Sequence, residues 1–258
     1  MSEAQNRLVQ TQFGATAAAY VASGGHAAGE DLERLVAWGR ALRPCRALDI
    51  ATGGGHTALA FAPVAGRVTA CDLTEPMLAA ARAFARGRGG LNVDFVAGDV
   101  VALPFLDGAF DVVTCRIAPH HFADVAGAVR QVQRVLRPGG SFLVQDILGH
   151  DDAEAAAFIL EVERRRDPSH VRAYRAVEWR AFLRAAGLTV MEEAVVAKER
   201  PWAEWTGRMR MEDGARRDLE RYVRQAPERC RAAFDFRLTP GGVQAFTDRM
   251  ILLRAERD

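Results

Sequence analysis

The chain has 258 residues and a formal net charge of +1, with 49% hydrophobic and 26% charged residues. This composition is typical of a folded globular protein and excludes an intrinsically disordered one. The near-zero net charge disfavours duplex nucleic acid as a partner. No apolar run approaches the roughly 18 residues of a membrane span, and the first ten residues lack the pattern of a secretory leader. We therefore expect a cytoplasmic protein with no nucleic-acid or membrane partner.

The cysteines are too dispersed to suggest a metal site or a disulfide framework. Cys45, Cys71, Cys115 and Cys230 form no CxxC pair, and no histidines follow at zinc-finger spacing. Structural zinc sites and small disulfide-rich scaffolds both require closely spaced ligands or partners. We expect no bound metal.

Short apolar segments alternate with helical patterns between residues 46 and 147. Apolar residues at helical spacing, such as Met77 and Ala81, indicate the helices, and Asp124 is placed to cap the last of them. Strands are predicted at residues 46–51, 67–72, 93–97, 110–115 and 141–147. Apolar strands alternating with helices predict an α/β fold with a doubly wound, mostly parallel sheet. Its binding crevice is expected at the carboxyl ends of the strands.

The flanking segments favour helices. Residues 4–42, 151–187 and 202–236 are predicted to be helical, and residues 188–197 and 250–254 to be strands. No internal repeat or linker is present. We therefore expect one domain over residues 1–258, with a core of about 43–150 and 174–258 and a helical cap made from 1–42 and parts of 151–236.

A glycine-rich segment, Asp49-Ile50-Ala51-Thr52-Gly53-Gly54-Gly55, follows the first predicted strand. Glycines at this point let the backbone turn sharply and approach a ligand closely. The segment departs from the GxGxxG pattern of dinucleotide sites, because Ala58 stands where the third glycine would be. Asp49, ahead of the loop, would repel a pyrophosphate and attract an ammonium group.

Two further carboxylates follow later strands. Asp72 ends the second strand, where it can accept hydrogen bonds from ribose hydroxyls; the alternative is that it caps the turn before Thr74. Asp99 follows the third strand and could meet the exocyclic amine of adenine, with Leu73 and Val100 lining the ring, or could belong to an ordinary Gly-Asp turn. Together these features predict a site for an adenosine joined to a cationic amino-acid tail.

Four motifs, in order, resemble those of class I S-adenosylmethionine-dependent methyltransferases. ALDIATGGGHTALA is similar to the acid-x-Gly-x-Gly-x-Gly motif at Asp49, Gly53 and Gly55, with Ala51 in place of the first glycine. RVTACDLTEPML, FVAGDVVALPFLDGAFDVVTCRIAPHHF and RVLRPGGSFLVQD resemble the family's second-strand, adenine and fifth-strand segments. APHHF and LRPGG are most similar to the ubiquinone/menaquinone-biosynthesis type.

The resemblance implies a Rossmann-like fold, S-adenosyl-L-methionine as cofactor and methyl transfer to a small-molecule acceptor. A phenolic or quinol ring is one possible acceptor, and C-, O- and N-methylation are equally open. The oligomeric state is expected to be a monomer or a homodimer. The residues expected at the cofactor are Asp49, Ala51, Thr52, Gly53, Gly55, Asp72, Leu73, Met77, Gly98, Asp99, Val100, Arg116, Ile117 and Tyr20.

Methyl transfer from a sulfonium chiefly requires that acceptor and methyl be held in line. An acceptor with a weakly acidic proton also gains from a base that titrates near neutral pH, as histidine does. His120 and His121, after the fourth strand, are the first candidates for a base or for orienting the acceptor; the alternative is two loop histidines with no chemical role. Asp167 and His170 are a second candidate pair, or part of a helix terminus.

Phe13 and Tyr20 could cover the cofactor, because an aromatic ring can face a sulfonium favourably, or could be core residues. Two other functions compete with methyl transfer. A catalytically silent S-adenosylmethionine-binding protein would keep the same motifs, since this chemistry has no obligatory catalytic residue. A nucleotide-dependent oxidoreductase would need glycine at position 58 and a first strand end without Asp49.

Overall fold

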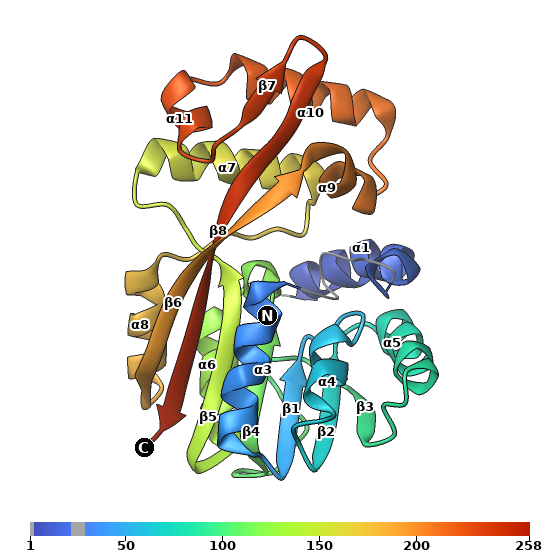
Figure 1. Ribbon diagram of the computed structural model, residues 1–258, viewed down its shortest axis with the longest axis vertical. Helices are drawn as coiled ribbons and strands as arrows, with labels where there is room; N and C mark the ends of the chain where they lie inside the picture. The colour runs from blue at the N-terminus through green and yellow to red at the C-terminus, as the bar shows by residue number, and fades with distance from the viewer. Residues whose placement is uncertain (1–2, 22–28) are drawn as a thin grey trace.

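Figure 1 shows a computed structural model of the chain, which describes residues 3–21 and 29–258. Within helix α1 (Glu3–Val21), the side chains at positions 15, 16 and 18–20 lie outside the described part. Among the described helices, none combines the length and the apolarity that crossing a bilayer requires.

A single mixed sheet runs through the centre of the molecule, in the strand order β3-β2-β1-β4-β5-β8-β6. The first five strands of this order pair in parallel, and β8 lies antiparallel between β5 and β6. The strands are β1 (Arg46–Ile50), β2 (Arg67–Asp72), β3 (Val93–Ala97), β4 (Phe110–Arg116), β5 (Leu136–Ile147), β6 (Leu188–Pro201), β7 (Arg237–Thr239) and β8 (Gly242–Arg257). This topology confirms the predicted doubly wound α/β class. β5 begins earlier than predicted because Leu136 pairs with Phe110 of β4.

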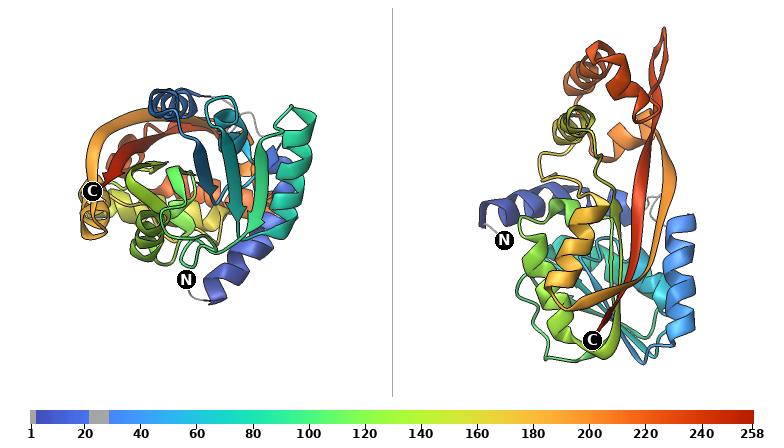
Figure 2. Two further views of the ribbon diagram at one scale, coloured as in Figure 1. Left: turned by 90° about the horizontal axis from the view of Figure 1, so that it is seen from below. Right: turned by 90° about the vertical axis from the view of Figure 1, so that its left-hand side faces the viewer.

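Helices cover both faces of the sheet, as the right-hand view of Figure 2 shows. The helices of the core are α3 (Glu30–Leu42), α4 (His56–Phe61), α5 (Glu75–Gly87), α6 (Val125–Val135) and α8 (Ala176–Ala185). Leu35, Trp38 and Phe61 of α3 and α4 pack on one face. Val132 and Trp179 of α6 and α8 pack on the other. Strands buried on both faces explain the continuous apolar runs in the sequence.

Helix α1 lies across the carboxyl ends of the central strands (Figure 1). Phe13 and Ala17 of this helix pack against Met77 of α5. The Gln10 side chain also donates a hydrogen bond to the main-chain oxygen of Leu73, 3.2 Å away, just beyond the end of β2. The helix therefore forms a roof over the edge at which a doubly wound sheet binds its ligands.

Strands β6 and β8 extend beyond the core and carry a second hydrophobic cluster (Figure 1). This part, which we call the cap, contains α7 (Ala153–Arg166), α9 (Trp202–Arg208), α10 (Asp213–Gln225) and α11 (Glu228–Ala232). Its cluster includes Phe158, Trp205 and Phe246. The cap is thus not purely helical, because β7 and the outer halves of β6 and β8 belong to it.

Several expectations about the flanks were wrong. The segment 151–187 is two helices, α7 and α8, separated by residues 167–175. The segment 202–236 is three helices, since Pro227 begins a new helix and Arg210 adopts the left-handed conformation (φ 50°) between α9 and α10. The segment 30–42 packs on the sheet instead of joining the cap, because Leu35 and Trp38 are buried against strand residues. The strand predicted at 188–197 extends to residue 201 because its charged end pairs with β8.

A buried ion pair lies where β6 and β8 leave the core. The Nε of Arg200 donates to Oδ2 of Asp248 at 2.7 Å, and the two side chains are only 8% and 2% exposed. Removing one partner of such a pair leaves an uncompensated charge away from water. The pair therefore makes the passage of these strands from core to cap sensitive to single substitutions.

Asp248→Ala is expected to lower the free energy of unfolding by about 3–5 kcal/mol, because it leaves the buried Arg200 guanidinium without its carboxylate partner. Urea denaturation followed by circular dichroism measures this. Glu199→Ala is the matched control, since Glu199 of β6 pairs with Arg237 of β7 but both side chains are more than half exposed. The control should change stability by no more than about 1 kcal/mol. Equal losses in the two variants would contradict the expectation.

Candidate functional site

A cavity of about 100 Å³ lies between the carboxyl ends of the parallel strands and α1. It is bounded below by the glycine loop after β1 and by the ends of β2 and β4, and above by Val9 and Phe13 of α1. Its lining contains three charged side chains, Asp72, Asp99 and Arg116. The predicted crevice is therefore present at the predicted edge of the sheet.

The glycine loop turns at residues in the left-handed region of backbone space. Gly53 has φ 54°, and Ala51, which replaces the family's first glycine, has φ 49°. A residue with a Cβ atom is strained there by about 1–2 kcal/mol. Ala51 therefore keeps the turn that glycine would make, at some conformational cost, and the loop still reaches the cavity.

Asp72 ties the glycine loop to the segment after β2. Its Oδ2 accepts a hydrogen bond from the main-chain N–H of Gly53 at 2.8 Å, and its Oδ1 accepts from that of Thr74 at 2.9 Å. Burial raises the pKa of Asp72, and these hydrogen bonds oppose that rise. Asp72 therefore caps the turn before Thr74, and the same carboxylate lines the cavity.

Asp49 does not line the cavity, which corrects the expectation that it meets a ligand directly. Its carboxylate accepts hydrogen bonds from the hydroxyls of Thr52 and Thr114, both at 2.6 Å, and is 2% exposed. Burial raises its pKa to about 6. Because Asp49 is buried and does not face the cavity, it supports the loop from behind.

Asp99 receives a hydrogen bond from helix α1. The Asn6 amide nitrogen donates to its Oδ2 at 2.7 Å, and the N–H of Val101 donates to its Oδ1 at 3.1 Å. The Asn6 amide oxygen is buried and has no hydrogen-bond partner within residues 3–21 and 29–258. A buried acceptor without a donor costs free energy, and here it stands beside a cavity-lining carboxylate. Helix α1 therefore fixes the position of a carboxylate that lines the cavity.

Arg116, at the end of β4, is held by Asp31 of α3. Its Nη2 lies 2.8 Å from Oδ2 of Asp31, and Lys198 Nζ of β6 lies 3.2 Å from the same oxygen. Burial opposes ionisation of Asp31, but Arg116 and Lys198 together lower its pKa. Ile117 follows with φ 53°, an unusual conformation for a β-branched residue. This end of the cavity therefore carries positive charge.

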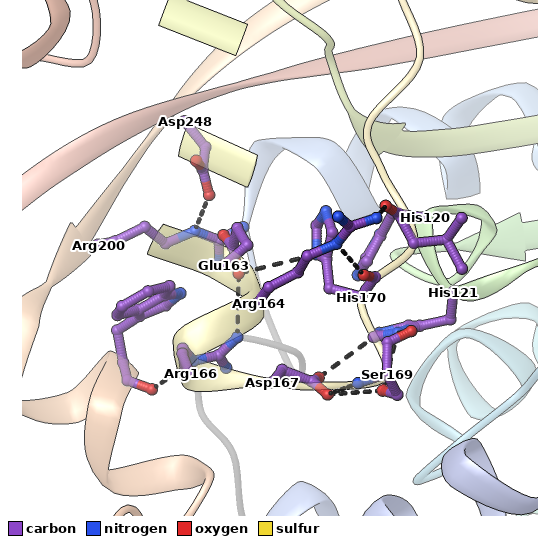
Figure 3. Close-up of polar contacts among 12 residues, drawn as sticks. His120, His121, Glu163, Arg164, Arg166, Asp167, Ser169, His170, Arg200 and Asp248 are labelled. Carbon is purple, nitrogen blue, oxygen red and sulfur yellow. Dashed lines mark hydrogen bonds and ion pairs between the residues drawn. The ribbon is translucent and has the colours of Figure 1, made fainter. Parts of the chain in front are cut away.

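Figure 3 shows three histidines close together. His120 and His121 belong to the short 3₁₀ helix η1 (Pro119–His121), and His170 comes from the loop after α7. The ring centroids of His120 and His121 are 4.1 Å apart, and those of His120 and His170 are 4.9 Å apart. His121 lines the cavity, whereas His170 lines a second cavity of about 410 Å³ below the cap. The sequence pattern did not predict this clustering of His170 with the other two.

Each histidine of the cluster stands near a buried carboxyl group. His120 Nδ1 is 2.6 Å from Asp146 Oδ1, and His170 Nδ1 is 3.8 Å from Glu163 Oε2. Burial lowers the pKa of both histidines well below the ordinary value. Burial also raises the pKa of Asp146 to about 8 and that of Glu163 to about 7. Desolvation thus favours the neutral form of all four groups.

The structure brings most of the expected cofactor residues to one cavity. Those that line it are Ala51, Thr52, Gly53, Asp72, Leu73, Met77, Asp99, Val100, Arg116 and Ile117, together with His121. Those that do not are Asp49, Gly55, Gly98 and His120. A Cβ on Gly55 or Gly98 would meet Ala81 or Cys71 within 3.0 Å, so these glycines serve packing. The side chain of Tyr20 lies outside the described part of the chain.

Sequence reasoning missed several lining residues. His56 and Thr57 line the cavity from the first turn of α4, directly after the glycine loop, and this position could have indicated them. Val9 and Phe122 line it as well, but a lone apolar residue carries no signal of ligand contact. Phe13, weighed as a cover for the cofactor or as a core residue, is both a lining residue and packed against Met77.

Comparisons with known proteins agree with this geometry. Residues 48–144 match the family model of the methyltransferase domain. The chain is 40% identical over 183 residues to the uncharacterized methyltransferase YcgJ of Bacillus subtilis (strain 168), covering 71% of this chain and 72% of YcgJ. It is 43% identical over 129 residues to the demethylmenaquinone methyltransferase of Thermus thermophilus, covering 44% of this chain and 58% of that protein.

A solved structure extends the similarity to nearly the whole chain. BH2331 of Bacillus halodurans C-125, provisionally assigned as a methyltransferase, superimposes with a TM-score of 0.85 at 37% identity, covering 89% of this chain and 99% of that one. The similarity therefore includes the cap as well as the sheet. With its strand order and its carboxylate-lined crevice, the chain belongs to the class I S-adenosylmethionine-dependent methyltransferases.

Proposed function

We propose that this protein transfers the methyl group of S-adenosyl-L-methionine to a small-molecule acceptor, with the cofactor in the cavity beneath α1. The observation that carries this proposal is that Asp99, Asp72 and Arg116 all line one cavity. Asp99 follows β3, Asp72 is the last residue of β2 and Arg116 is the last residue of β4. An adenine amine, two ribose hydroxyls and an amino-acid carboxylate are the groups that such a series would bind.

The residues present fit this cofactor. Asp99, which lines the cavity, would accept from the adenine amine. Asp72 retains acceptor capacity beyond the N–H groups of Gly53 and Thr74, because a carboxylate has about four lone-pair sites. The cofactor supplies an activated methyl group on a sulfonium, so the protein needs chiefly to position the acceptor and exclude water.

The amino-acid end of the cofactor would lie toward Arg116. The Arg116 guanidinium lines the cavity, and a planar guanidinium is suited to pair with a carboxylate of the ligand. Asp49 would act on the ligand ammonium through the loop it holds instead of by direct contact, since it is buried behind that loop and does not line the cavity.

The acceptor would approach the wall formed by His121 and the aromatic rings around it. The Phe13 ring meets that of His121 edge to face, with centroids 4.9 Å apart, and Phe122 lines the same cavity. Such a wall suits a flat or apolar acceptor carrying one polar reacting group. The similarity to a demethylmenaquinone methyltransferase supports a phenolic or quinol ring as one such acceptor. His121 is our candidate for the base.

Asp72→Ala is expected to weaken binding of S-adenosylhomocysteine by about 1–3 kcal/mol, through loss of the hydrogen bonds to the ribose. Isothermal titration calorimetry measures the affinity, and a thermal melt shows whether the loop still folds. Asp94→Ala, which removes an exposed carboxylate of β3, should bind like the parent. Equal affinity of all three proteins would discard the role of Asp72, and binding of a nicotinamide dinucleotide in place of S-adenosylhomocysteine would refute the proposed function.

His121→Ala is expected to lower methyl transfer by about 10²-fold or more while S-adenosylhomocysteine still binds, because a general base contributes in this range. The assay follows labelled methyl from the cofactor into the small-molecule fraction of a cell extract. His150→Ala, a substitution of a partly exposed histidine that lines the second cavity and not the first, serves as the matched control. Normal transfer by His121→Ala would remove its role as base. No transfer by the parent protein, despite cofactor binding, would identify a silent binding protein.

Asp146 is expected to make the stability of the protein fall as the pH rises. Its pKa is raised to about 8 in the folded chain from an ordinary value of 3.8, so between these values the folded chain holds a proton that the unfolded chain has lost. The contribution to the free energy of unfolding therefore decreases over that interval.

Asp146→Asn, which cannot ionise, should accordingly lose less stability than the parent between about pH 5 and about pH 8. Urea denaturation at the two pH values measures the difference. Asp151→Asn, at an exposed position, should follow the parent. Parallel pH dependences of Asp146→Asn and the parent would contradict the expectation.

A further inference from the structure

The imidazole of His121 is held on one side by the segment after α7. Its Nδ1 lies 3.2 Å from the main-chain oxygen of Ser169 and 3.1 Å from the Ser169 hydroxyl oxygen. The Ser169 hydroxyl in turn donates to Oδ1 of Asp167 at 2.6 Å (Figure 3). His121 is 9% exposed, Asp167 1% and Ser169 0%, so water does not compete for these contacts.

These contacts determine which ring nitrogen of His121 carries the hydrogen. A main-chain carbonyl can only accept a hydrogen bond. The Ser169 hydroxyl hydrogen is committed to Asp167, so this oxygen also faces Nδ1 as an acceptor. Both neighbours of Nδ1 are therefore acceptors, and Nδ1 must be the donor. In the neutral ring, Nε2 is then left with its lone pair.

Two other histidines, His120 and His150, have different partners at Nδ1. His120 Nδ1 faces a carboxyl group of Asp146 that can donate or accept according to its protonation. His150 shows the opposite arrangement, because its Nδ1 accepts from the main-chain N–H of Asp152 at 3.0 Å. His150 is therefore expected to carry its hydrogen on Nε2 and provides an internal reference.

We propose that Nε2 of His121 accepts the proton of the methyl acceptor, and that Ser169 and Asp167 are positioning residues that keep this nitrogen unprotonated and the ring oriented. The proposal rests on the proposed methyl transfer and deepens it. It restricts the acceptor to a nucleophile that bears a removable proton: a hydroxyl, an amine or an activated carbon.

The step balances without a further reagent. The bond between the acceptor atom and its hydrogen breaks, the proton goes to Nε2, and the electron pair forms the new bond to the methyl carbon as the carbon–sulfur bond breaks and its pair stays on sulfur. The imidazolium that results keeps its Nδ1–H directed at Ser169. Oδ2 of Asp167, 3.9 Å from Nε2, lies close enough to favour that positive charge.

Helix α1 secures the arrangement from the other side. The Gln5 amide nitrogen donates to the main-chain oxygens of His121 at 3.1 Å and of Ser169 at 2.8 Å. The carbonyl of Ser169 has two lone pairs, so it can accept from Gln5 and from His121 Nδ1 together. Helix α1 thus joins the segment that carries His121 to the segment that carries Ser169, and this keeps Nδ1 of His121 close to its two acceptors.

The test is long-range ¹H–¹⁵N NMR of the ¹⁵N-histidine-labelled full chain without cofactor or acceptor, near pH 8, with His121→Gln for assignment. We expect a pyrrole-type Nδ1 and a pyridine-type Nε2 for His121, and the reverse for His150. Ser169→Ala removes one acceptor and should lower the ratio of the Nδ1–H to the Nε2–H form of His121 by about fivefold, the effect of one ordinary hydrogen bond.

Ser141→Ala is the matched control, because Ser141 is also a buried serine, 1% exposed, and its hydroxyl contacts no partner in the described chain. It should leave the ratio unchanged. A predominant Nε2–H form of His121 in the parent protein would overturn the proposal whether or not any variant folds. An unchanged ratio in a folded Ser169→Ala protein would overturn the positioning role.

Failure of this inference can be told apart from failure of the proposed function. The NMR measurement uses neither cofactor nor acceptor, so it remains readable in a protein that transfers nothing. S-adenosylhomocysteine binding, measured on the same samples, tests the proposed function. Normal binding with the wrong tautomer would refute the base alone.

Discussion

The architecture of the site depends on one buried carboxylate at the end of β2. Asp72 accepts the main-chain N–H groups of Gly53 and Thr74, and so joins the loop after β1 to the start of α5. These N–H groups would otherwise lie unpaired at the edge of the sheet, which is costly away from water. The same carboxylate lines the cavity, so the interaction that closes the two loops also places a hydrogen-bond acceptor where ribose hydroxyls would be.

The buried charged groups around the cavity all have partners, and their sign changes along the edge of the sheet. Asp49 is desolvated behind the glycine loop, with two threonine hydroxyls as partners, whereas Asp31 is shared by Arg116 and Lys198. Buried charges persist in proteins only when they are paired or hydrogen-bonded. Each group here meets that condition, and the charge that faces the cavity changes from negative near β2 and β3 to positive near β4. This polarity matches a zwitterionic nucleoside ligand.

The histidine cluster shows how core and cap cooperate. His120 and His121 come from the core, and His170 and Ser169 from the segment that leads out of α7 into the cap junction. The contacts between these two pairs of residues require that β6 and β8 hold the cap at a defined position over the edge of the sheet. The buried pair of Arg200 and Asp248 lies in those strands, so the stability of the junction and the geometry beside the cofactor cavity depend on the same segments.

Local periodicity and turn chemistry are enough to predict the alternating strands and helices, the glycine loop and the carboxylates at the end of β2 and just after β3. They also predict the crevice, since parallel strands must present their carboxyl ends at one edge. Three features could not be predicted in this way: Asp49 turns toward Thr52 and Thr114, α3 packs on the sheet, and His170 joins His120 and His121. Those outcomes depend on contacts between residues far apart in the chain, where burial and hydrogen-bond pairing select one arrangement among several that the local pattern allows.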